Sequence, residues 1–157
     1  MTKRQYLVTH IRQWLATQLP DIPQPKRFYL ARLSELTKER GFLFAGLLKE
    51  EYQNKPLEYG VSRSSKVEMG FYVFTGCRIP NNQTDMYERI DALLERVEPV
   101  VMTIPVPKDW IETDNFQFQI HEIRLDNNEP VIIEQEDLDA FVTLHGTIVF
   151  SQKLKNP

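Results

Sequence analysis

The side chains that could carry chemistry are few and scattered along the chain. Three histidines and one cysteine could bind zinc only if folding gathered them, because none has a partner at CxxC or HxxxH spacing. The serines of GVSRSS, residues 60–65, are not set in a GxSxG elbow, and the six glycines never reach the spacing of a phosphate-binding loop. The sequence therefore favours solvated or core-edge histidines and a small buried thiol over a metal or nucleophile site: His10, Cys77, His121 and His145.

Charged residues give no stronger indication of an active site. Carboxylates are densest at 50–51 and 134–139, where a pair could act as acid and base in a pocket, but acidic residues between strands normally solvate a loop. Basic residues interleave with aromatic residues in the first 40 positions, and acidic residues elsewhere cancel their field. The net charge of -3, without a long block of one sign, disfavours tight binding of nucleic acid or anionic lipid. We expect no enzyme activity, no metal and no cofactor.

Length and composition predict one globular domain over residues 1–157. The chain is 41% hydrophobic and 26% charged, which is close to the average for soluble domains. It has no apolar run of membrane-spanning length and no signal-peptide pattern, and its lone cysteine excludes an intramolecular disulfide. These features favour folding in a reducing cytoplasm.

The first half of the chain predicts one helix followed by three strands. The helix is expected at 3–18, where Leu7, Ile11, Trp14 and Leu15 share one face and Thr2 and Gln5 have capping-box spacing. Prolines from position 20 onward end it. A polar, turn-rich loop, expected to be mobile, is predicted near 53–65. Apolar patterning predicts the strands at 27–36, 41–52 and 66–76.

The second half predicts a helix and two further strands. The helix is expected from an N-cap at Thr84 to about residue 98, because Pro99 follows. A proline-bearing connection is predicted at 103–115 and a turn at 126–130. The apolar residues of the stretch 116–125 change from even-numbered to odd-numbered positions at His121–Glu122, so a β-bulge is predicted there. The two strands are expected at 116–125 and 140–151, with a short polar tail over 152–157.

Together these elements predict an α+β fold in the order α-β-β-β-α-β-β. The strands leave one apolar face of a sheet in need of cover, which two helices can supply. We therefore expect a two-layer sandwich with a mainly antiparallel sheet of about five strands and both helices packed on one face.

Residues 66–151 contain four patterned stretches: KVEMGFYVFTG, TDMYERIDALLERVEPVV, FQFQIHEIRLD and FVTLHGTIVFS. Their pattern resembles the tail terminator family of long-tailed bacteriophages, the lambda minor tail protein U type. The resemblance lies in topology and patterning, with a weaker match for the first helix and 41–52. It implies a structural virion protein that forms a hexameric ring on the tail tube, ends tube polymerisation and offers the head-docking surface. A head-to-tail ring closes at a fixed copy number, so growth stops by geometry.

The resemblance also implies a set of partners. These are further copies of the chain, the tail tube protein, a head–tail connector or neck protein, sheath protein if the tail is contractile, and genomic DNA that passes through the lumen without specific binding. The protein is expected at the head-proximal end of the virion tail after assembly in the host cytoplasm, without membrane contact. The DNA path implies an acidic or neutral lumen.

Contacts with neighbours are expected from the loop 53–65 and the connection 103–115, with Trp110 as the best anchor unless it packs on its own domain. No family site is transferred residue by residue, because this chain has a longer proline-rich segment and a larger loop than shorter members. The alternatives are another neck or head-completion ring protein, or a small enzyme or adaptor with a pocket between helix 84–98 and the sheet. The candidate contact residues are Tyr59, Arg63, Lys108, Trp110, Glu134 and Asp137.

Overall fold

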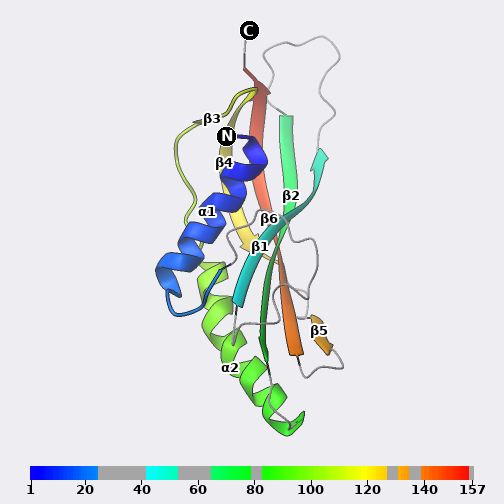
Figure 1. Ribbon diagram of the computed structural model, residues 1–157. Coiled ribbons are helices and arrows are strands. Elements are labelled where there is room, and N and C mark those ends of the chain that lie inside the picture. Colours follow the sequence, from blue (N-terminus) through cyan, green and yellow to red (C-terminus); the bar gives the residue numbers. More distant parts are fainter. Residues whose placement is uncertain (25–41, 53–64, 79–82, 127–130, 135–138, 156–157) are drawn as a thin grey trace.

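The fold comes from a computed structural model that describes residues 1–24, 42–52, 65–78, 83–126, 131–134 and 139–155 (Figure 1). It describes only the backbone at 42, 52, 65, 77–78, 83–87, 131–134 and 139–141. The predicted strand 27–36, all but Asp126 of the predicted turn 126–130 and all but Ser65 of the predicted loop 53–65 lie outside the described residues. The elements are α1 (Lys3–Gln18), β1 (Phe42–Tyr52), β2 (Ser65–Arg78), α2 (Gln83–Met102), β3 (Ile111–Glu112), β4 (Phe116–Leu125), β5 (Val131–Glu134) and β6 (Asp139–Leu154).

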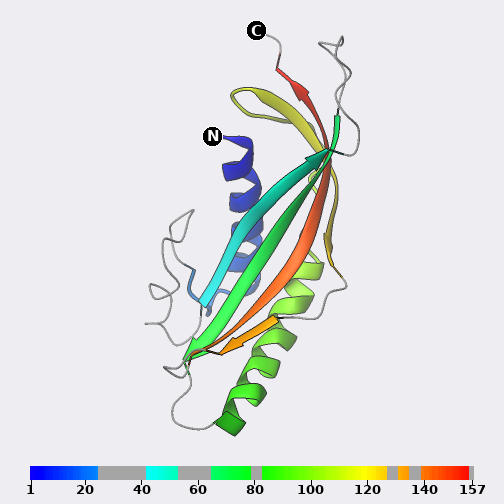
Figure 2. The same cartoon turned by 90° about the vertical axis from the view of Figure 1, so that its right-hand side faces the viewer.

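The described strands form one antiparallel sheet in the order β1-β2-β6-β4-β3, and β5 also pairs with β6. Both helices lie on one face of this sheet, and the long strands bend as they cross it (Figures 1 and 2). The predicted α+β class, the antiparallel sheet and the placement of the helices on one face are therefore confirmed.

The core lies between the helices and the sheet, as the apolar alternation predicted. In β2, Val67, Met69, Phe71 and Val73 are fully buried, whereas the residues between them are half-buried and Lys66 before them is exposed. Buried residues of β4, β6 and both helices complete one cluster between the two layers. Phe44, Phe74 and Val149, which have the opposite strand parity, are also buried but do not belong to this cluster. The start of α1 has the predicted capping box between Thr2 and Gln5. The remaining buried members include Leu7, Ile11, Leu15, Val97, Val101, Phe118, Leu144, Ile148 and Phe150.

The β-bulge predicted in β4 is present. The register with β6 shifts between Ile120 and Glu122, so His121 is the extra residue. Its effect is visible in burial, because Ile120 and Ile123 both face the core although they are three residues apart.

Several predicted boundaries were wrong. α2 begins at Gln83, so Thr84 is not its N-cap, and it continues through Pro99 to Met102. Burial of Val101 one turn after Val97 explains why the helix persists beyond the proline. Thr103 Oγ1 then donates to the carbonyl oxygen of Pro99 at 2.9 Å.

The sheet also extends beyond the predicted strands. The short strands β3 and β5 were not predicted, because two and four residues are too few to show a period. β6 continues to Leu154, and the buried Gln152 lies in the segment expected to be a polar tail.

Arginine side chains of α1 bond to the backbone of the edge strand β1. Arg12 donates from Nε and Nη2 to the carbonyl oxygen of Ala45 at 3.1 and 3.0 Å, and Arg4 Nη2 donates to that of Leu48 at 3.0 Å. The amide of Leu43 donates to the carbonyl oxygen of Pro23. Part of this edge is therefore satisfied by the chain itself, which limits strand addition there.

Lys3 places a positive charge inside the fold. Its side chain is 7% exposed, and its Nζ lies 3.0 Å from Glu50 Oε1 of β1 and 2.6 Å from Gln152 Oε1 of β6. The same ammonium group lies 4.6 Å from the centroid of the Phe116 ring of β4. Because a buried charge needs partners on several sides, Lys3 fixes the start of α1 against three strands.

The variant K3M should lower the free energy of unfolding by about 3 kcal/mol, because Glu50 would lose its buried cationic partner. Urea unfolding measures the loss. R4M is a matched control that also removes one positive charge from the first turn, and it should cost about 1 kcal/mol or less. Equal losses in the two variants would contradict the structural role of Lys3.

Gly146 is required where β2 and β6 pack most closely. It pairs with Phe71, and a Cβ at this position would overlap both the Phe71 ring and the backbone oxygen of Arg124. G146A should therefore destabilise the protein by about 1–3 kcal/mol in urea unfolding. The control G70A should cost clearly less, because its Cβ would meet only Leu48, a side chain that is 42% exposed. An unchanged midpoint for G146A would contradict the tight packing.

Candidate functional site

The structure describes only part of the predicted contact set. Lys108 and Trp110 lie on the surface between α2 and β3. Glu134 ends β5, where only the backbone is described. Tyr59, Arg63 and Asp137 lie outside the described residues, so their predicted roles stay predictions.

The segment 103–110 is held against the domain by side chains from the rest of the fold. Nε2 of His10 lies 2.7 Å from the carbonyl oxygen of Pro105, and Gln119 Nε2 donates to that of Lys108 at 3.0 Å. At its start, Trp14 Nε1 donates to the carbonyl oxygen of Val100 at 3.0 Å. The side chains that this segment exposes therefore have a fixed backbone beneath them.

Trp110 is a large aromatic residue that the fold leaves 44% exposed. The ammonium group of Lys153 lies 4.7 Å from its ring centroid, so the indole carries a cation on one face. Lys108 is exposed two residues away. We call Lys108, Trp110 and Lys153 the Trp110 surface. It joins an apolar ring to two positive charges, and the exposed Asp109 lies between Lys108 and Trp110 in the chain. The three named residues together could contact an acidic protein surface.

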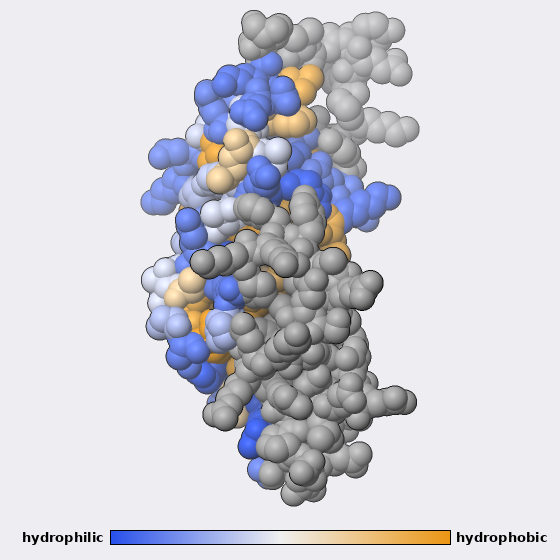
Figure 3. Space-filling view, in the orientation of Figure 1, coloured by the Kyte–Doolittle hydropathy of each residue, from blue (hydrophilic) through white to orange (hydrophobic). Residues whose placement is uncertain are grey.

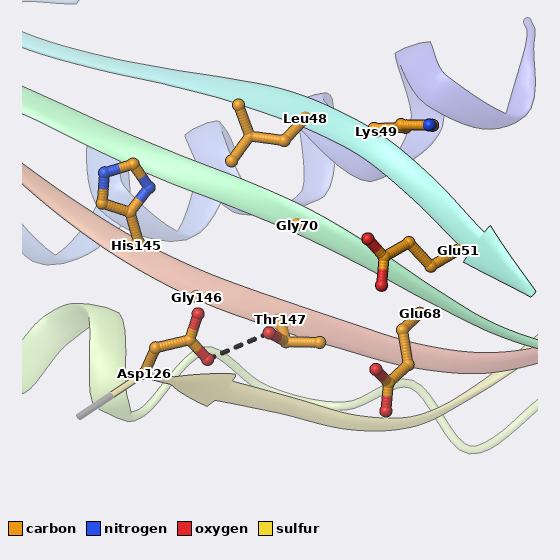
Figure 4. Close-up of a pocket in the computed structure, with 9 residues that line it drawn as sticks. All are labelled: Leu48, Lys49, Glu51, Glu68, Gly70, Asp126, His145, Gly146 and Thr147. Atoms are coloured by element: carbon orange, nitrogen blue, oxygen red, sulfur yellow. Dashed lines mark hydrogen bonds between the residues drawn. The ribbon is translucent and has the colours of Figure 1, made fainter. Parts of the chain in front are cut away.

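A hollow of about 470 Å³ lies over the face of the sheet opposite the helices. Figure 4 shows its floor along β1, β2 and β6, with the carboxylates of Glu51 and Glu68 at one end and the imidazole of His145 at the other. Thr147 Oγ1 donates to Asp126 Oδ1 at 2.9 Å, and Glu51 and Glu68 are cross-strand partners. The remaining lining residues are Leu48, Lys49, Gly70 and Gly146.

The hollow does not bring its histidine and glutamates together for acid–base work. His145 pairs with Tyr72, four residues from Glu68 on β2, which places them about 13 Å apart along the strand. Glu68 lies 3.9 Å from Arg124, so a cation stands beside one of the two paired glutamates. The hollow is thus a polar depression with paired carboxylates at one end and His145 at the other.

The three histidines lie apart in the fold. His121 Nε2 lies 2.6 Å from Ser151 Oγ, six residues along β6 from His145, or about 20 Å away. His10 contacts Pro105 on the other side of the sheet. Within the described residues, no three His, Cys, Asp or Glu side chains are grouped to hold a metal ion.

A tyrosine and a carboxyl group, those of Tyr72 and Asp21, have pKa values shifted by their surroundings. Burial raises the pKa of Tyr72, and the nearby Arg12 guanidinium opposes this shift more weakly. The hydrogen bond from Arg96 is the main cause that lowers the pKa of Asp21.

The surface seen in Figure 3 is largely hydrophilic over the described residues, with smaller hydrophobic areas between charged side chains.

No protein-family model matches the chain, and no curated protein matches it with significant similarity. Neither helix in the described part of the chain is long and apolar enough to span a membrane.

The sequence singled out Trp110 as an anchor, which stays a prediction, but it indicated neither the hollow nor the environment of Trp110. Leu48, Gly70 and Gly146 come from three strands, and their proximity depends on the order β1-β2-β6, which patterning alone does not determine. Lys153 lies in the segment that was expected to be a polar tail, so nothing in the sequence indicated its contact with Trp110. The glycines inside predicted strands were the available hint, because a strand glycine often marks a close approach.

Substitution of the two tryptophans should separate a surface residue from a packed one. W110A should cost about 1 kcal/mol or less of unfolding free energy, because it removes mainly an exposed cation–π contact. W14A should cost about 3 kcal/mol, because Trp14 packs against the core and bonds to Val100. Chemical unfolding monitored by circular dichroism measures both. A large loss in W110A would assign Trp110 to its own domain's packing instead of a contact surface.

Proposed function

We propose that the protein is a structural subunit of a phage tail, of the tail terminator kind, which forms a closed ring at the end of the tail tube. In this role the ring stops addition of tube subunits and provides the surface to which the head docks. The resemblance of residues 66–151 to that family motivates the proposal, and the shape of the subunit supports it.

The observation that carries the proposal is the one-sided construction of the fold. Both helices cover one face of the sheet, and the other face carries the open polar hollow (Figures 2 and 4). A rigid subunit with two unlike faces can bind its neighbour head to tail, and such a contact closes into a ring when the rotation per subunit allows it.

Two features of the packing suit a subunit of this kind. The Lys3 contacts with Glu50 and Gln152 join α1 to β1 and β6, so the two layers are fixed relative to each other. The arginine contacts along β1 satisfy part of that edge within the chain. Assembly would therefore use contacts between side-chain surfaces in preference to strand addition at 43–48. Such surfaces can fix the angle between subunits.

The charge of the chain is compatible with a DNA path. A ring through which DNA slides should bind phosphate weakly, because each strong phosphate contact would slow the passage. The net charge of -3 and the carboxylates of Glu51, Glu68 and Asp126 on the open sheet face agree with such a lumen. These residues would then repel the DNA backbone instead of holding it.

Electron microscopy tests the proposal in two steps. Negative-stain images of the purified protein, alone and mixed with phage tail tubes, should show six-fold annuli or particles at one end of the tubes. Polymerisation of tube protein in its presence should give shorter tubes. Binding at the portal side of heads instead would favour a neck or head-completion protein.

W110A is a suitable folded control for the same images, because the anchor hypothesis predicts fewer occupied tube ends. Normal occupancy with W110A would remove Trp110 as an anchor and leave the terminator role intact. The absence of both annuli and end binding with the wild-type protein would contradict the proposed function itself.

A further inference from the structure

One flank of α2 carries a line of carboxylates. Glu88, Asp91, Glu95 and Glu98 follow one another at intervals of three, four and three residues, which places them on one side of the helix. We call these four residues the acidic stripe. Its first three side chains are exposed, and Glu98 is half-buried. None of the four forms a salt bridge with a described residue, so they repel one another without a described counter-charge.

The orientation of the stripe follows from the opposite flank of α2. There Arg96 binds Asp21, just after the end of α1, at 2.8 Å. The arginine flank therefore faces α1, and the acidic stripe faces away from it. Met102, which is 61% exposed, continues the line of the stripe four residues beyond Glu98. The stripe thus ends in an accessible apolar side chain.

The Trp110 surface has the complementary composition. Lys108 and Lys153 supply two positive charges against the one negative charge of the exposed Asp109, and neither lysine forms a salt bridge with a described carboxylate. Lys153 has the strand parity of His145 and Thr147, so it belongs to the sheet face opposite the helices. The stripe and the Trp110 surface therefore lie on different layers of the same subunit.

We infer that the acidic stripe of one subunit binds the Trp110 surface of a second copy of this chain. The carboxylates would meet Lys108 and Lys153, and Met102 would provide apolar area for the exposed indole of Trp110. Because two different surfaces are used, each copy keeps one free stripe and one free Trp110 surface after the first contact. The contact is therefore heterologous and can propagate from subunit to subunit until a ring closes.

Charge and exposure favour a second copy over other occupants. A nucleic acid would be repelled by the stripe, and an apolar helix would leave four carboxylates without counter-charges. This chain itself supplies both halves of a complementary pair at equal concentration. The inference rests on the proposed function, because it names the contact through which the ring would form. The attraction should weaken as salt is added, since exposed charges are screened.

Charge reversal tests the pairing in trans. The stripe variant is D91K/E95K and the surface variant is K108E/K153E, each studied by sedimentation velocity over a concentration series at low salt. Either variant alone presents like charges to its own copies, so its dissociation constant for self-association should rise at least about tenfold. An equimolar mixture should recover wild-type association to within about threefold, because every contact again joins opposite charges. The restored assembly should contain equal numbers of both variants.

E51K/E122K is the matched control, because it changes the net charge as much as the stripe variant does but lies on neither surface. It should associate like the wild-type protein, and thermal unfolding should show that all variants remain folded. Unchanged association of the single-surface variants, or no recovery in the mixture, would overturn the pairing.

A wild-type protein that stays monomeric at every concentration would also overturn the inference. In that case binding of the same protein to tail tube ends decides the proposed function separately. Rings that form normally from both variants would overturn the pairing but support the proposed function.

Discussion

The buried ammonium group of Lys3 is the contact on which the arrangement of the two layers depends. It binds Glu50 of β1 and Gln152 of β6 and lies over Phe116 of β4, so one charge links the first helix to strands that are not all neighbours in the sheet. A shift of β6 by one residue would turn Gln152 to the other face and leave this charge without one partner. The docking of α1 and the register of the sheet are therefore fixed together.

Periodicity and capping chemistry predicted most of the described elements, because each is a local property of the sequence. The stripe of Leu7, Ile11 and Leu15, the capping box at Thr2 and the parity shift at His121 were all confirmed. The errors arose where distant residues decide the outcome. Packing of Val101 carries α2 past Pro99, and β3 and β5 exist only because longer strands offer an edge for pairing.

The candidate site was less accessible to sequence reasoning for the same reason. Trp110 could be singled out as a large aromatic residue in a proline-bearing connection, but its partner Lys153 lies in β6 and reaches it only through the folded sheet. The hollow depends on residues of three strands and on Asp126 at the end of β4. Its histidine and its glutamates lie at opposite ends, a separation that follows from the pairing of β2 with β6.

The position of β6 has a consequence for how the chain reaches this fold. This strand forms the centre of the sheet, yet its residues follow those of β1, β2 and β4 along the chain. During synthesis β1 can pair with β2, and β3 with β4, before β6 is made, but the two parts of the sheet join only through β6. Long-range pairing of this type slows folding, and until it is complete each half presents an unpaired hydrophobic strand. β6 is therefore the strand that joins the two parts of the sheet, and the full sheet can form only once it has been made.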